Sequence, residues 1–296
     1  MKMTILGTVR NGWLLALLAL LPSMPVLAQL SSTPQEKFWT TDGTVYSMLE
    51  TNGVIYIGGD FSYVGPNNGS GAVTPTNSTA PYTGWPGVDG DVYAAVSDGA
   101  GGWYIGGSFV SVGDVVRTNL AHILSSQIVD PVWNPSANGP VNAIAIVGSD
   151  VIVGGSFTTI NGLGRSRIAS INKTTGLPTA WLPEASSTVN ALLPYTRTIF
   201  IFGFPFTYTT VFVGGSFSEI GGQPRDRLAE LSPFSNTNNA TSWNPDLNGT
   251  VNALSISGST LYAGGSFTLV GGLARNRLAA ISTSTGVATA WNPNAN

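Results

Sequence analysis

The residues best suited to chemistry are arginines that recur at a fixed distance from a Gly-Gly-x-Phe motif. Each lies eight residues after the phenylalanine of its motif, and they are Arg117, Arg165, Arg225 and Arg275. In three cases another arginine follows two residues later, and side chains two apart on a strand share a face. Such pairs could bind an anionic glycan through bidentate contacts. Their recurrence in register favours a structural role instead, in which each arginine binds carbonyls or stacks on an aromatic ring of the neighbouring unit.

A carboxylate pair and a lone histidine are the next candidates. Asp89-Gly90-Asp91 resembles the start of a calcium loop. The same Asn/Asp-Gly pattern recurs before other expected strands, at Asp42, Asn138 and Asn248. We therefore interpret the segment as a turn. His122 is the only histidine, which excludes a two-His metal site within this chain, and its alignment with Ser170, Glu230 and Ala280 predicts a strand residue on the solvent face.

The remaining acids do not gather into a recognisable catalytic centre. A glycosidase needs two carboxylates, but the 15 acidic residues are dispersed along the chain. The sequence shows no phosphate loop, no nucleophile elbow and no cluster of metal ligands. We therefore expect no catalytic residue, no cofactor and no metal.

The elements that position these residues repeat along the chain. The Gly-Gly-x-Phe motif begins at Gly58, Gly106, Gly154, Gly214 and Gly264. Tryptophans keep a similar period, at Trp39, Trp85, Trp133, Trp181, Trp243 and Trp291. The last full unit contains four short runs bounded by turn residues, namely 251–257, 261–267, 277–282 and 287–291. Four strands in a unit of about 40–50 residues are typical of a β-propeller blade.

These markers divide the chain into five units, of about residues 40–85, 86–133, 134–181, 182–243 and 244–291. The predicted fold is all-β, a propeller of at least five four-stranded blades over residues 29–296. Each glycine pair should let a neighbouring backbone or ring approach closely, and each closing tryptophan should fill the space between units. Because Trp291–Asn296 matches the link between units, either five blades close the ring or the chain is part of something longer.

The motif series VGGSF, GGxxRxRLA and TAWNP resembles the delta-60 repeat family of secreted bacterial proteins. The resemblance covers about residues 38–296. It implies a propeller-like secreted or surface protein without a defined reaction. The first unit departs from the pattern, since Gly69 replaces the first arginine and residues 71–84 are rich in Thr and Pro, so its third strand matches the repeat least well.

The first 28 residues predict an export signal. Lys2 and Arg10 precede an apolar run at Trp13–Leu21, and Val26-Leu27-Ala28 offers small residues to a signal peptidase. Nine apolar residues are too few for a membrane anchor, which needs about 20. We expect a secreted, extracellular or surface protein, with the periplasm as an alternative. The chain has no cysteine, so its fold must depend on packing and strand pairing.

The fourth unit is longer than the others. Val189 and Gly214 are 25 residues apart, whereas Val251 and Gly264 are 13 apart, and Thr198–Gly203 mirrors Thr210–Gly215 at an offset of twelve. This predicts a duplicated second strand, of which one copy bulges out as a loop or hairpin. The bulge carries Phe200, Phe202, Phe204 and Phe206. Exposed aromatics often mark a contact surface or an aggregation liability; the alternative is a strand that packs on its own blade.

The sequence therefore favours a non-enzymatic binding, adhesion or scaffold module, whose partner is a glycan or another surface protein. One alternative is a glycan-active hydrolase or lyase with two carboxylates about 5–9 Å apart at the propeller mouth. Another is a multivalent lectin with a site between each pair of blades. A net charge of −3 offers no footprint for nucleic acid, and no segment after the signal could span a membrane.

Overall fold

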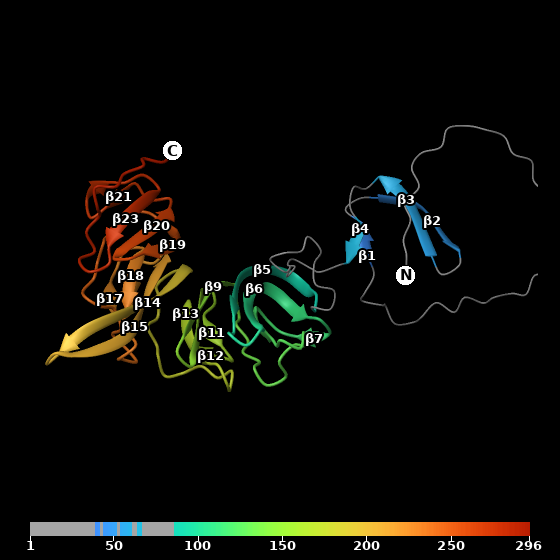
Figure 1. The fold of residues 1–296 in the computed structure, drawn as a ribbon, viewed down its shortest axis with the longest axis horizontal. Helices are drawn as coiled ribbons and strands as arrows, with labels where there is room; N and C mark the ends of the chain where they lie inside the picture. The colour runs from blue at the N-terminus through green and yellow to red at the C-terminus, as the bar shows by residue number, and fades with distance from the viewer. Residues whose placement is uncertain (1–38, 42–43, 52–53, 61–63, 67–85) are drawn as a thin grey trace, which may run out of the picture. The chain divides into compact units, whose positions relative to one another are not determined.

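The computed structural model describes residues 39–41, 44–51, 54–60, 64–66 and 86–296, with side chains from residue 86 onwards except that of residue 201. Over these residues the fold is all-β, with antiparallel sheets throughout and no helix (Figure 1). Consequently, no described helix is long and apolar enough to cross a bilayer. The expected signal at 1–28 and the Thr/Pro-rich stretch at 71–84 lie outside the described residues.

The chain divides into two compact parts, residues 1–67 and 68–296. In the first part, β1 (Trp39–Thr41) pairs with β4 (Val64–Pro66), and β2 (Thr44–Thr51) pairs with β3 (Val54–Asp60). The register of β2 and β3 shifts between Val45 and Ser47, opposite Gly58 and Gly59. The same irregularity recurs at the glycine pair of later units, which supports a common repeat.

The second part contains four repeat units, each built on one antiparallel sheet. The sheet strands are β5 (Val88–Ser97), β6 (Trp103–Val112) and β8 (Leu120–Ile123); β9 (Val141–Val147), β10 (Asp150–Gly155) and β13 (Ile168–Asn172); β14 (Val189–Ile201), β15 (Phe204–Gly215) and β18 (Leu228–Leu231); and β19 (Val251–Ser257), β20 (Thr260–Gly265) and β23 (Leu278–Ser282). In each unit the second strand lies between the first and the third.

A short hairpin follows the second strand of each unit. Its strands are β7 (Val115–Val116), which pairs with the end of β6; β11 (Thr159–Ile160) and β12 (Leu163–Gly164); β16 (Glu219–Ile220) and β17 (Gln223–Pro224); and β21 (Leu269–Val270) and β22 (Leu273–Ala274). The expected fourth strand at 287–291 is reduced to a single bridge, Ile281 to Ala288. The prediction of four full strands is therefore wrong for this unit.

The interpretation of Asp89-Gly90-Asp91 as a turn is also wrong. These residues lie inside β5, where the register shifts between Asp89 and Gly90. Gly90 has φ +125°, and an added Cβ would lie 2.3 Å from the carbonyl oxygen of Ser108. The extra residue of this β-bulge is Val110 on β6, and glycine at position 90 of β5 accommodates both the backbone angle and the close opposite strand.

Consecutive units pack together through the first glycine of each pair, as the sequence suggested. A Cβ added to Gly154 would lie 2.4 Å from Cγ1 of Val189, and one added to Gly214 would lie 2.6 Å from Cγ1 of Val251. Each valine begins the first strand of the following unit. The absent side chain therefore makes room for the next unit, which explains why glycine is needed there.

The closing tryptophans fill the space between units, as expected. The Nε1 groups of Trp133, Trp181 and Trp243 donate to the carbonyls of Asn172, Ser232 and Ser282, at 3.2, 3.1 and 3.0 Å. Every acceptor belongs to the unit that follows. The rings lie in three buried clusters that mix residues of adjacent units. Inter-unit packing is therefore continuous from residue 86 onwards.

A ladder of asparagine side chains joins the first strands of successive units. Asn142 donates to Oδ1 of Asn190 at 3.3 Å, and Asn190 donates to Oδ1 of Asn252 at 3.1 Å. The same amides also reach the carbonyls of Val189 and Val251, both at 3.4 Å. Strands β9, β14 and β19 consequently lie side by side.

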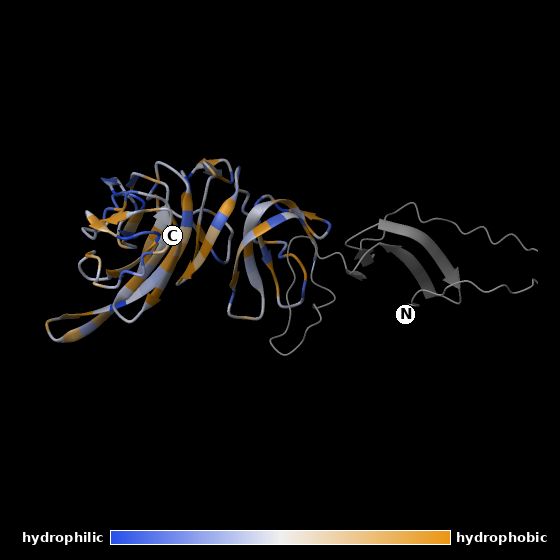
Figure 2. Cartoon of the chain, turned by 90° about the horizontal axis from the view of Figure 1, so that it is seen from above, coloured by the Kyte–Doolittle hydropathy of each residue, from blue (hydrophilic) through white to orange (hydrophobic). Residues whose placement is uncertain are grey.

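The long unit extends both strands of its hairpin. β14 has 13 residues and β15 has 12, against 7 and 6 in β9 and β10. Thr198 pairs with Thr207, and Ile201 pairs with Phe204 across a two-residue turn. The predicted hairpin is confirmed, and it projects from the sheet with an apolar tip (Figure 2). The idea of one spare strand is wrong, because the extra residues are divided between both strands.

Candidate binding pockets between repeat units

Two open pockets occupy equivalent positions between consecutive units. One, the Asp150 pocket, has a volume of about 330 Å³ and lies between the third and fourth units. The other, the Glu230 pocket, has a volume of about 360 Å³ and lies between the fourth and fifth units. Each combines the Thr-x-Trp segment of one unit with a turn of the next. The repeat therefore produces a pocket at the same place twice.

The Asp150 pocket has a polar floor and an apolar wall. Ser170 is buried on β13 and donates its hydroxyl to Oδ2 of Asp150 at 2.8 Å. Ile152, two residues after Asp150, pairs with Ser170 and lies on the same face of β10. Trp181 adds an aromatic wall, and Asn236 of the fourth unit adds an amide. One carboxylate, an amide and an apolar surface thus face one small cavity.

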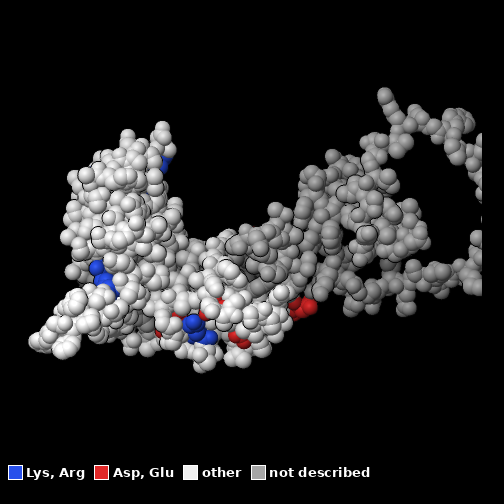
Figure 3. Space-filling model, viewed as in Figure 1, with Lys and Arg blue, Asp and Glu red and all other residues white. Residues whose placement is uncertain are grey.

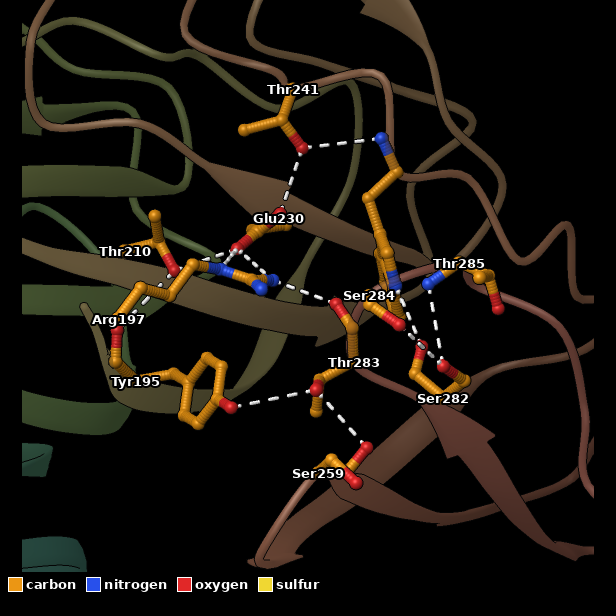
Figure 4. A network of polar contacts seen from close by, with 11 residues as sticks. Tyr195, Arg197, Thr210, Glu230, Thr241, Ser259, Ser282, Thr283, Ser284 and Thr285 are labelled. Atoms are coloured by element: carbon orange, nitrogen blue, oxygen red, sulfur yellow. Dashed lines mark hydrogen bonds and ion pairs between the residues drawn. The ribbon is translucent and has the colours of Figure 1, made fainter. Parts of the chain in front are cut away.

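The Glu230 pocket is built around a buried ion pair (Figure 4). Glu230 is 4% exposed, and its Oε1 lies 2.7 Å from Nη2 of Arg197. Oε1 also accepts from the Thr210 hydroxyl at 2.7 Å, and Oε2 accepts from the Thr241 hydroxyl at 3.0 Å. Both oxygens of the carboxylate are therefore satisfied, which offsets the cost of burying its charge.

Arg197 also reaches the following unit. Its Nη2 donates to the carbonyl of Thr283 at 2.7 Å, and its guanidinium carbon lies 4.9 Å from the centre of the Tyr195 ring. Arg197 belongs to the lengthened part of β14, so this contact exists in one unit only. The alignment of Glu230 with His122 predicted a strand residue on the solvent face, whereas Glu230 is buried. The sequence did contain a signal for the Arg197–Glu230 ion pair. Among the aligned positions, only the unit that gains Arg197 through its insertion has an acid, Glu230.

The equivalent position in the second unit holds His122, and the prediction of a solvent-facing residue is wrong. His122 is 7% exposed and stacks on Tyr104 with ring centres 4.1 Å apart. Its Nδ1 lies 2.8 Å from Oδ2 of Asp130, and its Nε2 lies 3.2 Å from Oδ2 of Asp98. The histidine thus bridges two carboxylates inside the protein.

This bridge changes the acidity of both carboxyls. Burial acts to raise the pKa of Asp98, but backbone N–H donors of Ala100 and Gly102, together with His122, outweigh it and lower the pKa. For Asp130, burial is likewise outweighed, by His122 and two backbone donors, so its pKa is also lowered. Burial and the two nearby carboxylates raise the pKa of Tyr104. Both acids are therefore held in their charged form.

The four recurrent arginines bind backbone carbonyls of their own units. Each donates from Nη1 to the residue before it and from Nη2 across to the segment that ends the unit. The distant acceptors are the carbonyls of Asp130, Thr179, Thr241 and Thr289, at 2.6–2.7 Å from Arg117, Arg165, Arg225 and Arg275 respectively. Burial lowers the pKa of Arg117, against the opposing effect of Asp130. This geometry fits a structural role within each unit.

The second arginines do not share a strand face with the first. Arg167, Arg227 and Arg277 have φ of 67°, 63° and 61°, which are left-handed conformations outside a strand. Nη1 of Arg167 donates to the carbonyl of Phe157 at 3.2 Å, and Nη1 of Arg227 donates to that of Phe217 at 2.8 Å. The paired guanidinium groups of the alternative, glycan-binding interpretation are therefore not formed.

The phenylalanines singled out from the sequence lie at the tip of the β14–β15 hairpin. Phe202 and Phe204 are exposed, and Phe206 is 6.1 Å from Phe234 between ring centres. In the space-filling view, charged atoms are scattered and none colours the projecting tip (Figure 3). The aromatics and the recurrent arginines thus lie on different elements. Comparison of the chain with family models, curated proteins and solved structures gives no match.

Proposed function

We propose that this chain is a non-enzymatic, secreted or surface-attached β-propeller that binds glycans in pockets between its blades. The observation that carries the proposal is the recurrence of one pocket at equivalent inter-unit positions. A protein with several equivalent pockets can bind several parts of one glycan at once, so weak affinities of single pockets combine into a higher avidity. The delta-60 resemblance of the sequence agrees with a secreted repeat protein.

The inter-unit contacts support the arrangement of the units as blades. First strands lie side by side through the asparagine ladder, and each interface between the units from residue 86 onwards uses the same valine and glycine contact. The outer face of the last unit carries the same residue types as these interfaces, a tryptophan and a glycine, but here they are not buried by a neighbouring unit. Trp291 is 45% exposed, whereas the equivalent Trp243 is 5% exposed. Gly264 meets no atom closer than 3.5 Å, whereas Gly214 would meet a valine. This face is suited to receive another blade.

The Asp150 pocket supports a saccharide ligand. Sugars present hydroxyls that a carboxylate and an amide can bind, and an apolar face that packs on side chains. Asp150 and Asn236 supply the polar groups, and Trp181 and Ile152 supply the apolar wall. Small-ligand sites commonly combine a mainly apolar lining with a few convergent polar groups.

The pockets favour binding over hydrolysis. Glycoside hydrolysis uses two carboxylates on either side of the scissile bond. Each of the two pockets has a single carboxylate, and that of Glu230 is neutralised by Arg197.

Glycan-array binding of the purified mature chain tests the proposal. The wild type should retain specific glycans, and Asp150→Asn should weaken retention at least about tenfold, because a charge-assisted hydrogen bond is lost. Asp226→Asn, which changes an exposed carboxylate elsewhere, serves as the control. If no glycan is retained, or if Asp150→Asn binds as well as the wild type, the assignment of this pocket is wrong.

A further inference from the structure

The tip of the β14–β15 hairpin is an apolar surface that the pockets do not use. Phe202 is 97% exposed, and Phe200 and Phe204 beside it are also exposed. The tip projects from the sheet (Figure 2). Exposed apolar groups gathered at one place normally mark a contact site.

The base of the hairpin is held firmly. Arg197 connects β14 to Glu230 on β18 and to Thr283 of the following unit. On the same side, the Tyr208 ring lies 5.1 Å from the Phe234 ring. These contacts fix the base to two units, so the tip is presented at a defined place.

The turn itself is built at a cost. Phe202 and Gly203 have φ of 51° and 84°, as a two-residue turn with two left-handed residues requires. Asn, Asp or Gly usually occupies the first of these positions, and a bulky residue there is strained. Phe202 is almost fully exposed, so packing within the chain does not offset this strain. Strain of this kind concentrates at functional sites, so we look for its partner outside the chain.

The chemistry of the tip indicates what that partner is. No Asp, Glu, Lys or Arg occurs from Thr198 to Ser218. The threonine hydroxyls below the tip satisfy one another, with Thr196 to Thr209 at 3.1 Å and Thr198 to Thr207 at 3.0 Å. The tip thus offers neither charge nor free hydrogen-bonding side chains. Protein interfaces carry a hydrogen bond per roughly 100–200 Å², and the side chains of this surface do not supply them.

A lipid bilayer fits these properties better. We propose that the hairpin tip inserts Phe200, Phe202 and Phe204 into the surface of a zwitterionic bilayer. Its outermost three residues span roughly 10 Å at about 3.3 Å per residue, which matches the depth of about 5–10 Å reached by interfacial segments. Tyr208 and the threonines lie further down the hairpin, outside the inserted segment. The paired strands satisfy the backbone groups that face each other.

Co-sedimentation of the full mature chain with phosphatidylcholine vesicles tests this inference. The wild type should sediment with the vesicles. The triple variant Phe200→Ser, Phe202→Ser, Phe204→Ser should lose at least about tenfold in partitioning, because each phenylalanine contributes buried apolar area. The matched control changes three exposed apolar residues elsewhere, Val116→Ser, Val132→Ser and Leu177→Ser, and should partition as the wild type does.

A second measurement uses the absence of cysteine in the chain. Phe202→Cys carries one environment-sensitive fluorophore at the tip, and Leu177→Cys carries it elsewhere. Vesicles should raise the emission of the first and leave the second unchanged.

Three outcomes would overturn the inference: no sedimentation of the wild type, equal sedimentation of the triple variant, or binding that requires anionic lipid and disappears in salt. Self-association without lipid, removed by the triple variant, would instead assign the tip to a second copy. Glycan binding through Asp150 does not depend on any of these results, so the two proposals fail separately.

Discussion

Nη2 of Arg197 lies 2.7 Å from Oε1 of Glu230, and this contact ties the inserted part of one repeat to the core of the same repeat. The insertion therefore does more than lengthen a hairpin. It supplies the cation without which a carboxylate at this buried position would be unpaired. The aromatic tip and the pocket below it share this anchor.

Removing the arginine should destabilise the protein strongly. Arg197→Ala leaves Glu230 buried and charged, a change that typically costs about 3–5 kcal/mol. Chemical denaturation measures the free energy of unfolding. Asp226→Asn, at an exposed ion pair with Arg227, should change it by less than about 1 kcal/mol. Equal effects of the two variants would contradict a special role for the buried pair.

Stability should fall in acid because backbone N–H donors and His122 hold Asp98 and Asp130 in their charged form. The pKa values of Asp98 and Asp130 are lowered below 3.8 in the folded protein. The folded state therefore binds fewer protons near pH 4 than the unfolded state, and the resulting stability is present above the unfolded pKa and lost as pH falls through the folded pKa. Chemical denaturation should be carried out from neutral pH down to below about pH 4. Asp98→Asn should have a lower free energy of unfolding than the wild type at neutral pH, and this difference should shrink in acid. A constant difference would contradict the linkage.

Gly214→Ala should destabilise through a clash. Its Cβ would lie 2.6 Å from Val251 of the next unit, and overpacking of this kind costs about 1–3 kcal/mol. Gly164→Ala, which meets nothing within 4 Å, is the control for thermal unfolding. Gly264→Ala then tests the propeller, since a loss as large as that of Gly214→Ala indicates that another blade covers this face. Tolerance of Gly264→Ala argues against such a blade.

Arg225→Ala and Arg275→Ala should lower the melting temperature. Each side chain crosslinks two carbonyls of its unit, and a hydrogen bond from a charged donor contributes about 1.5–3 kcal/mol. Differential scanning calorimetry gives the shift. If stability were unchanged while binding to polyanionic glycans vanished, the arginines would be ligand-binding residues instead.

Deleting residues 198–209 should not by itself restore a normal unit. The deletion moves Arg197 into a turn and leaves the buried Glu230 carboxylate without its ion-pair partner. The deletion alone should be less stable than the wild type. Stability should return when Thr196-Arg197 becomes Gly-Ser, as in the turn between Val147 and Asp150, and Glu230 becomes Ser, as at Ser170. Circular dichroism and thermal melts compare the three chains. A deletion that melts as the wild type does would show that the ion pair is dispensable.

The sequence by itself determined the first three strands of the last unit, the repeat and the contacts that repeat. Gly154, Gly214 and the tryptophans could be assigned to inter-unit packing because the same residue types recur at one period, and only a shared local geometry explains such recurrence. The hairpin was also readable, since an extra twelve residues in one unit must leave the common sheet.

Some aligned positions hold different residues in different units, and only the tertiary structure decided their roles. His122, Ser170, Glu230 and Ala280 occupy equivalent buried positions in successive units. The partners differ: His122 binds Asp98 and Asp130, Ser170 binds Asp150, and Glu230 binds Arg197 on an extended strand. Period and residue type do not give these distances. A buried charge takes whichever partner the folded chain brings within reach, and that choice depends on packing between segments far apart in the sequence.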